Sequence, residues 1–250
     1  MGILTQWDED GKKFYSTGCD RGMLYKFDKT LNSGKGGYGE GVAWNGLTSI
    51  NDSPSGADPT DLWADNQKYL SIRAAEEYGF TINAYQSPEE FDECDGMAAP
   101  IKGIKIGQQN RAMFGFSYRS LIGNDTELND HGYIIHLIYG ATCSPSDKDR
   151  STVNDSPDAV EFSWECTTTP VPIPGGKYKA SATIEIDSRN FTTEEAKAKL
   201  ASFEEIIYGK KGASSSADVK PKLPTPAEVF AHFGVLTDMV NDNSVLNSAG

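Results

Sequence analysis

Apolar and polar residues alternate along several stretches in the middle of the chain, which is the pattern of strands with one buried face. It predicts strands over residues 12–16, 23–27, 69–73, 76–85, 111–120, 159–167 and 178–187. Because 17–22 is rich in turn residues, the first two strands are expected to form a hairpin. In the last four strands we expect the following side chains to face the core: Tyr78, Phe80, Ile82, Ala84, Phe114, Phe116, Tyr118, Val160, Phe162, Trp164, Cys166, Tyr178, Ala180, Ala182, Ile184 and Ile186.

One predicted strand has a different pattern. Residues 133–141, YIIHLIYGA, are apolar on both faces of an extended chain. A strand of this kind is buried on both sides, so we expect a helix or another chain to cover its second face.

Two helices are expected near the carboxyl end. Thr192 and Glu195 match a capping box, and apolar residues then recur at helical spacing until Gly209, which predicts a helix that lies on the sheet. Residues 87–96 predict a further short helical turn. After the linker-like residues 209–222, Thr225, Pro226 and Glu228 begin a second helix that runs through residue 233. The pattern as a whole predicts a mostly antiparallel β domain with one packed helix and a carboxyl-terminal arm.

Residues 36–67 show neither a helical nor a strand period. They carry five acids and no Lys or Arg, yet include five large apolar residues: Trp44, Leu47, Ile50, Leu62 and Trp63. Long connections without secondary structure are usually functional or disordered, and disordered segments are poor in aromatic residues. We therefore expect this loop to contact a neighbouring subunit, with Trp44 and Trp63 as anchors.

Charge narrows the possible partners. The chain has a net charge of −13, and residues 1–100 contribute −9 of it, with 17 acids against 8 bases. Binding a nucleic acid requires Lys and Arg to neutralise its phosphates, so this excess of acids argues against a nucleic-acid-binding protein. No apolar run approaches the ~18 residues of a membrane span, and the amino terminus lacks the pattern of a signal peptide. We expect a soluble chain made without secretion.

The candidate ligands and catalytic groups give no recognisable site. The four cysteines, Cys19, Cys94, Cys143 and Cys166, lie far apart in the sequence, and we favour free thiols over the alternative of two disulfides. His131 and His136 would lie on opposite faces of a strand and so cannot share a metal ion. Residues 124–130, NDTELND, lack the spacing of an EF-hand and predict a polar hairpin loop. Since no GxSxG, HExxH or P-loop motif is present, we expect neither an enzyme nor a cofactor.

Glu161 and Glu165 share one face of their predicted strand. At about 3.3 Å per residue their Cβ atoms lie some 13 Å apart, farther than the roughly 5–9.5 Å that separates the two carboxylates of a glycosidase.

Four segments together resemble the major tail protein, the tail-tube subunit, of long-tailed, non-contractile bacteriophages. They are GVAWNGLTSINDSPSGADPTDLWADNQKYLS (41–71), AEEYGFTINAYQSPEEFDECDG (75–96), GNDTELNDHGYIIHLIYGATCSPS (123–146) and STVNDSPDAVEFSWECTTTPV (151–171). The resemblance covers about residues 10–233. Residues 234–250 have no counterpart in it, and the immunoglobulin-like domain of some relatives is absent.

The resemblance implies an antiparallel β-sandwich or barrel of the tail-tube type that forms hexameric rings, stacked into a tube. It implies a tail-tube domain over 1–208 with a long intersubunit loop (29–67), a linker (209–222) and a carboxyl-terminal helix and arm (223–250). The implied partners are further copies of the chain, the tape measure protein, and the tail tip and tail terminator proteins. Double-stranded DNA would pass through the lumen without specific binding. The implied location is the virion tail, after assembly in the host cytoplasm, without a membrane.

An acidic wall would repel DNA phosphates over about 8 Å, the Debye length at physiological salt, and so keep DNA sliding. Glu161 and Glu165 are the candidates for lumen-facing residues, although an outward or intersubunit position fits the same pattern.

Two other classes of protein are compatible with the sequence. A carbohydrate-binding β-sandwich module or adhesin predicts glycan binding with calcium, and an enzyme with paired carboxylates predicts turnover.

Overall fold

A nine-stranded antiparallel sheet and two separate hairpins organise the chain in the computed structural model, which describes residues 7, 9–34, 36–56, 59–73, 75–150, 152, 159–212 and 217–234. The sheet has the order β2-β1-β10-β11-β12-β7-β4, with β3 paired to β1 and β13 paired to β11. Its strands are β1 (Tyr15–Asp28), β2 (Gly37–Tyr38), β3 (Val42–Trp44), β4 (Leu47–Asp52), β7 (Gly79–Ala84), β10 (Phe114–Asn124), β11 (Leu128–Cys143), β12 (Phe162–Thr168) and β13 (Thr183–Asp187). The hairpins are β5 (Thr60–Ala64) with β6 (Gln67–Ile72), and β8 (Ala98–Ile101) with β9 (Ile104–Ile106).

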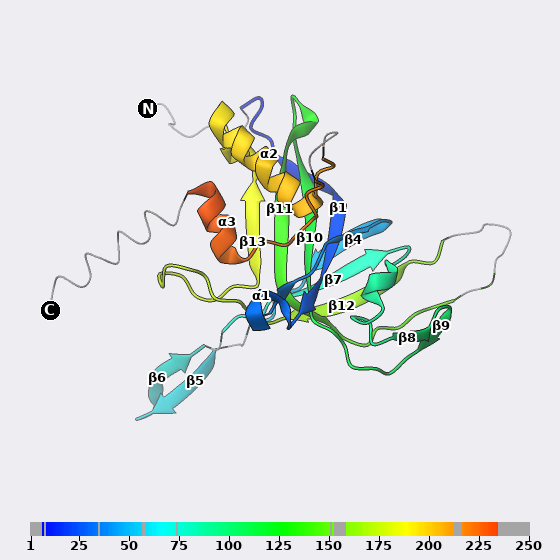
Figure 1. Ribbon diagram of the computed structural model, residues 1–250. Coiled ribbons are helices and arrows are strands. Elements are labelled where there is room, and N and C mark those ends of the chain that lie inside the picture. The colour runs from blue at the N-terminus through cyan, green and yellow to red at the C-terminus, as the bar shows by residue number, and fades with distance from the viewer. Residues whose placement is uncertain are drawn as a thin grey trace.

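The long strand β11 divides this sheet into two halves. One edge of β11 pairs with β10, whereas its other edge pairs with β13 over residues 134–138 and with β12 over residues 141–143. Strands β12, β7 and β4 thereby leave the plane of the first half and pack across one of its faces (Figure 1). The inner core between the halves consists of Leu24, Trp44, Phe80, Ile82, Ala84, Phe91, Cys94, Phe114, Phe116, Tyr118, Ile138, Ala141, Cys143, Trp164 and Cys166.

Helices cover the opposite face of the first half. Helix α2 (Glu194–Tyr208) crosses β11, β10 and β1, and α3 (Pro226–Phe233) packs beside it (Figure 1). The outer core beneath them contains Met23, Tyr25, Ile135, Leu137, Tyr139, Ile186, Leu200, Phe203, Ile207, Leu223 and Val229. Short turns complete the fold: α1 (Leu31–Gly34), and the 3-10 turns η1 (Glu89–Phe91) and η2 (Ser188–Asn190). The doubly apolar strand therefore has both faces covered, as its pattern predicts, by helices on one side and by β12 and β7 on the other.

The starts of the helices follow their capping residues. In α2 the N-cap is Thr193, whose hydroxyl accepts a hydrogen bond from the Ala196 N–H; the predicted capping box of Thr192 and Glu195 is wrong, because the helix begins one residue later and has Ala196 at N3. In α3 the capping box of Thr225 and Glu228 forms as predicted. Side-chain hydroxyls satisfy N–H groups that have no partner within the first helical turn, which is why these positions fix where each helix begins.

The strand alternation is confirmed in its central parts. The predicted inward residues that lie in β7, β10 and β12 are buried, except that Phe162 is only half-buried. Tyr78 and Val160 precede the observed strands and are also only half-buried. The predicted strand over 178–187 is shorter than expected, because β13 begins at Thr183, and the predicted inward residues Tyr178 and Ala180 are exposed.

Two predictions about the first third of the chain are wrong. Residues 12–27 form no hairpin, because β1 continues through the turn-rich stretch with β-bulges between Thr17 and Cys19 and between Asp20 and Met23. Positive φ angles at Gly18 and Arg21 accommodate these bulges without reversing the chain. Residues 36–67 are also not a structureless loop, since they contain β2, β3, β4 and β5.

The linker-like segment is partly packed against the domain. The Lys222 N–H donates to the Ile206 carbonyl oxygen of α2, and the next residue, Leu223, is buried in the outer core. Phe233 of α3 packs against Phe203 of α2 at a tilt of 45°, with ring centroids 5.2 Å apart. Helix α3 is therefore joined to the main body of the fold. Residues 235–250 of the predicted arm lie outside the described residues.

Candidate functional site

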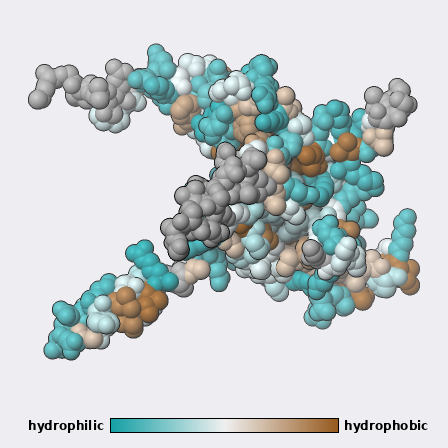
Figure 2. Space-filling model, turned by 60° about the vertical axis from the view of Figure 1, so that its left-hand side comes forward, coloured by the Kyte–Doolittle hydropathy of each residue, from teal (hydrophilic) through white to brown (hydrophobic). Residues whose placement is uncertain are grey.

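The β5–β6 hairpin presents apolar side chains on a segment that projects from the body of the molecule (Figure 1). Every residue of both strands is exposed. Leu62 pairs directly with Leu70, and Ile72 lies two residues farther along β6, so these three side chains share one face. Trp63 is 69% exposed and Tyr69 is 72% exposed. The lower-left projection in Figure 2 shows this apolar surface alongside hydrophilic residues.

A second projecting hairpin, β8–β9, was not predicted from the sequence. Ile101, Ile104 and Ile106 are each at least 45% exposed. The available signal was the short alternation IKGIKI over 101–106, in which Gly103 has a positive φ at the turn. We call β5–β6 and β8–β9 the two arms.

The structure separates the five predicted contact residues into three groups. Leu62 and Trp63 are exposed on the first arm, where they are available to a partner. Leu47 and Ile50 are half-buried against the inner core. A Cβ atom at Gly22 of β1 would lie only 2.3 Å from Leu47 Cδ1, which shows how closely Leu47 packs on the opposite half of the sheet.

Trp44 corrects the prediction of an intersubunit anchor. Its side chain is 3% exposed and contacts Phe91, Phe116 and Trp164, with ring centroids 4.5 to 5.7 Å apart. Its indole N–H donates to the Gln86 carbonyl oxygen at 2.9 Å. The subunit therefore buries this indole in its own core and leaves none of it for a neighbour.

The solvent face of β4, β7 and β12 is polar, and no helix of the described residues covers it. Cross-strand pairing aligns Ser49, Asn83 and Ser163 in one row, and Asn51, Thr81 and Glu165 in the next. Glu161 and Thr167 extend this face at the two ends of β12, and both are exposed. We call these eight residues the polar face. It contains two carboxylates and no Lys or Arg, and it includes both predicted lumen candidates.

A half-buried histidine links three strands at the margin of the inner core, where its ring stacks on Tyr118 with centroids 4.4 Å apart. His136 Nε2 lies 2.8 Å from Ser120 Oγ, and its Nδ1 lies 3.3 Å from a Glu185 carboxylate oxygen. The order Ser, His, Glu is that of a hydrolase triad. Such a triad also requires free N–H donors for an oxyanion, whereas Ser120 pairs with strands on both sides, β1 and β11. This geometry alone does not build a catalytic centre.

The environment of His136 predicts a pH-dependent stability. Burial lowers the pKa of His136, although the carboxylates of Glu185 and Asp52 oppose this effect. A histidine with a lowered folded pKa takes up its proton more readily when unfolded, so its contribution to stability is lost as pH falls below about 6.5. We expect the free energy of unfolding to decrease between pH 7.5 and 5.5, by at most about 1.4 kcal/mol per pH unit from this residue.

Urea unfolding at several pH values checks this prediction. The variant His136→Gln should make the free energy of unfolding less dependent on pH between 7.5 and 5.5, because it removes the titrating ring and keeps a polar side chain. The explanation fails if the variant retains the full slope.

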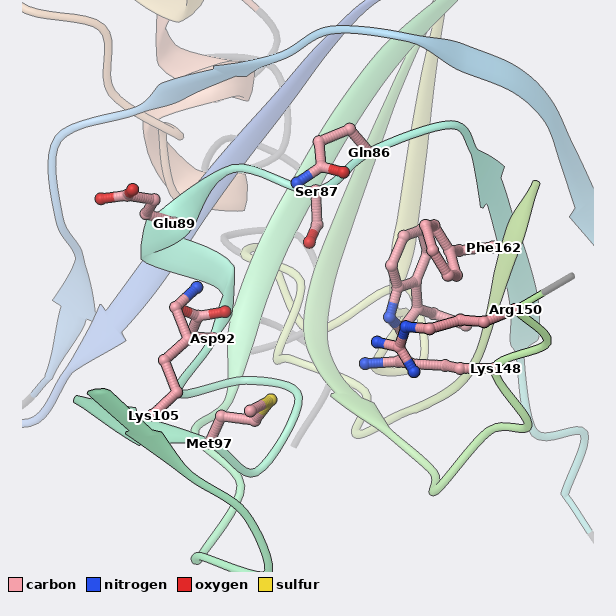
Figure 3. A pocket seen from close by; sticks show the side chains of 10 residues that line it. Gln86, Ser87, Glu89, Asp92, Met97, Lys105, Lys148, Arg150 and Phe162 are labelled. Atoms are coloured by element: carbon pink, nitrogen blue, oxygen red, sulfur yellow. The ribbon is translucent and has the colours of Figure 1, made fainter. Parts of the chain in front are cut away.

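A pocket of about 280 Å³ lies between η1 and β12 (Figure 3). Lys105 and Lys148 line it, but Asp92 and Asp95 respectively already neutralise their charges. The indole N–H of Trp164 also borders this pocket and has no hydrogen-bond partner among the described residues. Glu89 and Arg150 also line the pocket, so its wall carries charges of both signs and identifies no particular ligand.

The oxygen-rich loop over 124–130 forms the turn between β10 and β11. Asn124 Oδ1 accepts hydrogen bonds from the N–H groups of Thr126 and Glu127, and the Asp125 carboxylate accepts one from Gly11 N–H. These oxygens therefore support the turn that the sequence predicts. Within the part of the chain that the structure describes, no group of three or more His, Cys, Asp or Glu residues is arranged to hold a metal ion.

Comparison with known proteins adds no family assignment. No protein-family model matches the chain, and no curated protein matches it at a significant level. Among the described residues, no helix is both long and apolar enough to cross a membrane.

Proposed function

We propose that this chain is the subunit of a hollow tube built from copies of itself, of the kind that forms the tail of long-tailed bacteriophages. The proposal rests on one observation: the chain has two exposed apolar arms and, separate from them, a polar face that has no basic residue. The arms supply contact surface between subunits, and the polar face supplies the wall of a channel.

The first arm requires a partner on physical grounds. A lone two-stranded hairpin is at best marginally stable in water, and every residue of β5 and β6 is exposed. Large exposed apolar patches on a soluble chain mark association surfaces. A neighbouring copy that covers Leu62, Trp63, Leu70 and Ile72 would provide the burial that the arm lacks within its own chain.

The dimensions of a hexameric ring suit the passage of duplex DNA. If each subunit supplies the three strands of the polar face, 18 strands at about 4.8 Å spacing and about 40° tilt give a circumference of roughly 113 Å. The backbone diameter is then roughly 36 Å, and side chains of about 5 Å on each wall leave a bore of roughly 26 Å. A closed ring of strands also removes exposed sheet edges.

The polar face explains how DNA would move along such a bore. Its two carboxylates repel phosphates, and its hydroxyl and amide side chains offer no cation for a phosphate to bind. We place Glu161 and Glu165 on the channel wall.

The double variant Glu161→Lys, Glu165→Lys is expected to assemble and to bind DNA. Both side chains are exposed, so the substitutions leave the core intact, while each subunit changes by four charges and a six-subunit ring by 24. Retention of labelled duplex DNA by tubes at low salt measures the effect. A matched change away from the polar face, Glu194→Lys with Glu195→Lys on α2, should not retain DNA inside the tube. If tubes of both variants retain equal amounts of DNA, Glu161 and Glu165 do not lie on the channel wall.

Electron microscopy of the purified chain, alone and with tail-assembly partners, tests the function itself. We expect rings or tubes with a central channel. Discrete particles under all assembly conditions, together with glycan binding or turnover, would instead support a binding module or an enzyme.

A further inference from the structure

Three of the four cysteines lie in the inner core, and two of them face each other across neighbouring strands. Cys143 of β11 pairs directly with Cys166 of β12, and their Sγ atoms are 2.8 Å apart. Both side chains are at most 2% exposed. All four cysteines are free thiols in this structure, as the sequence predicts.

The ladder between β11 and β12 gives this pair a favourable geometry. The Thr169 N–H donates to the Gly140 carbonyl, and the Ser144 N–H donates to the Glu165 carbonyl. Because hydrogen-bonded and non-hydrogen-bonded pairs alternate along an antiparallel ladder, Cys143 and Cys166 form a non-hydrogen-bonded pair. In such a pair the Cα atoms are about 4.5 Å apart, within the range that a disulfide spans.

We propose that Cys143 and Cys166 are a latent cross-strand disulfide, formed when a peroxide oxidises the reduced chain. The sulfur atoms need to approach by only about 0.8 Å to reach the length of a disulfide bond. The bond would join the two halves of the fold at the point where β12 leaves β11. This inference concerns the single chain and does not depend on the proposed tube.

The chemistry balances with hydrogen peroxide as the oxidant. The thiolate of one cysteine attacks a peroxide oxygen, the O–O bond breaks, and a sulfenic acid and hydroxide form. The second thiolate then attacks the sulfenic sulfur and displaces its hydroxyl group, which leaves as water after protonation. Two thiols and one peroxide thus give one disulfide and two water molecules.

The environment of the pair makes this reaction slow in the folded state. Burial is the main cause that raises the pKa of Cys143 far above its usual value, so little thiolate is present at neutral pH. Cys19 is only half-buried, so its rate of modification serves as an internal reference for a more accessible thiol. A moderate urea concentration opens the fold transiently, and we expect it to accelerate oxidation of the pair.

Peptide mass mapping of the full chain, after peroxide treatment and alkylation without reductant, tests the proposal. We expect a cross-linked peptide pair containing Cys143 and Cys166, with the loss of two hydrogen atoms. The oxidised chain should melt roughly 5–10 °C higher, because the bond closes a loop of 22 intervening residues in the unfolded state. Cys143→Ala should abolish the cross-link and the shift, whereas Cys19→Ala should retain both.

Three outcomes would overturn the proposal. One is full modification of Cys19 with no cross-link at Cys143, even in urea. Another is a cross-link that joins Cys94 to either partner instead. The third is a cross-linked chain that melts no higher than the reduced chain, which would show that the bond distorts the ladder.

Discussion

Replacing Trp44 by alanine is expected to lower the free energy of unfolding by about 3–5 kcal/mol, the range for large aromatic residues in a well-packed core. The indole lies at the centre of an aromatic group with Phe91, Phe116 and Trp164, and its removal leaves a cavity between the two halves of the sheet. It also leaves the Gln86 carbonyl without its hydrogen bond. Urea unfolding followed by circular dichroism measures the loss.

The matched control is Trp63→Ala, the same change on an exposed arm. Because Trp63 is 69% exposed, its loss should change the unfolding free energy of the monomer by less than about 0.5 kcal/mol. A Trp44→Ala chain that loses less than about 1 kcal/mol would contradict the core position of this residue.

The same Trp63→Ala variant is expected to have its largest effect on assembly. An aromatic anchor at the centre of an interface contributes about 2 kcal/mol or more, which is roughly a thirtyfold change in the affinity of each contact. Since a ring repeats the contact around its circumference, the concentration needed for tubes should rise at least as much. Light scattering against protein concentration measures this threshold.

Trp7→Ala provides the control for that experiment. Trp7 is 77% exposed and lies outside both arms, so its removal tests whether any exposed indole matters. We expect Trp7→Ala to assemble at the wild-type threshold. If Trp63→Ala also assembles at that threshold, the first arm is not an intersubunit contact.

The sequence predicts those parts of the fold in which one local pattern extends over many residues. Phe80 and Ile82 in β7, and Leu200 and Phe203 in α2, are buried as their periods predict. In each case a strand or helix has one face against a core, and the spacing of apolar residues follows the geometry of that element. The doubly covered strand β11 is recognisable for the same reason.

Elements decided by distant partners are not predictable in this way. Trp44 occurs in a three-residue strand, β3, whose burial depends on Phe91, Phe116 and Trp164 from other parts of the chain. The turn-rich stretch over 17–22 resembles a hairpin turn locally, but pairing with β10 keeps it extended through two bulges. A pattern read along the chain does not contain these non-local contacts.

The candidate surfaces were predictable from the sequence only where a local pattern marks them. Glu161 and Glu165 are exposed on the polar side of a strand, as alternation predicts, but the polar neighbours on β4 and β7 become visible only in the folded sheet. The second arm is too short for a clear period, and its three isoleucines are notable only because they are exposed.

A cryo-electron microscopy reconstruction of the assembled chain tests the central claim most directly. We expect a closed ring or tube in which the polar face of β4, β7 and β12 lines a continuous channel, with Glu165 on its wall and the β5–β6 arm against a neighbouring copy. An assembly without a channel, or one whose channel is lined by basic side chains, would contradict the account.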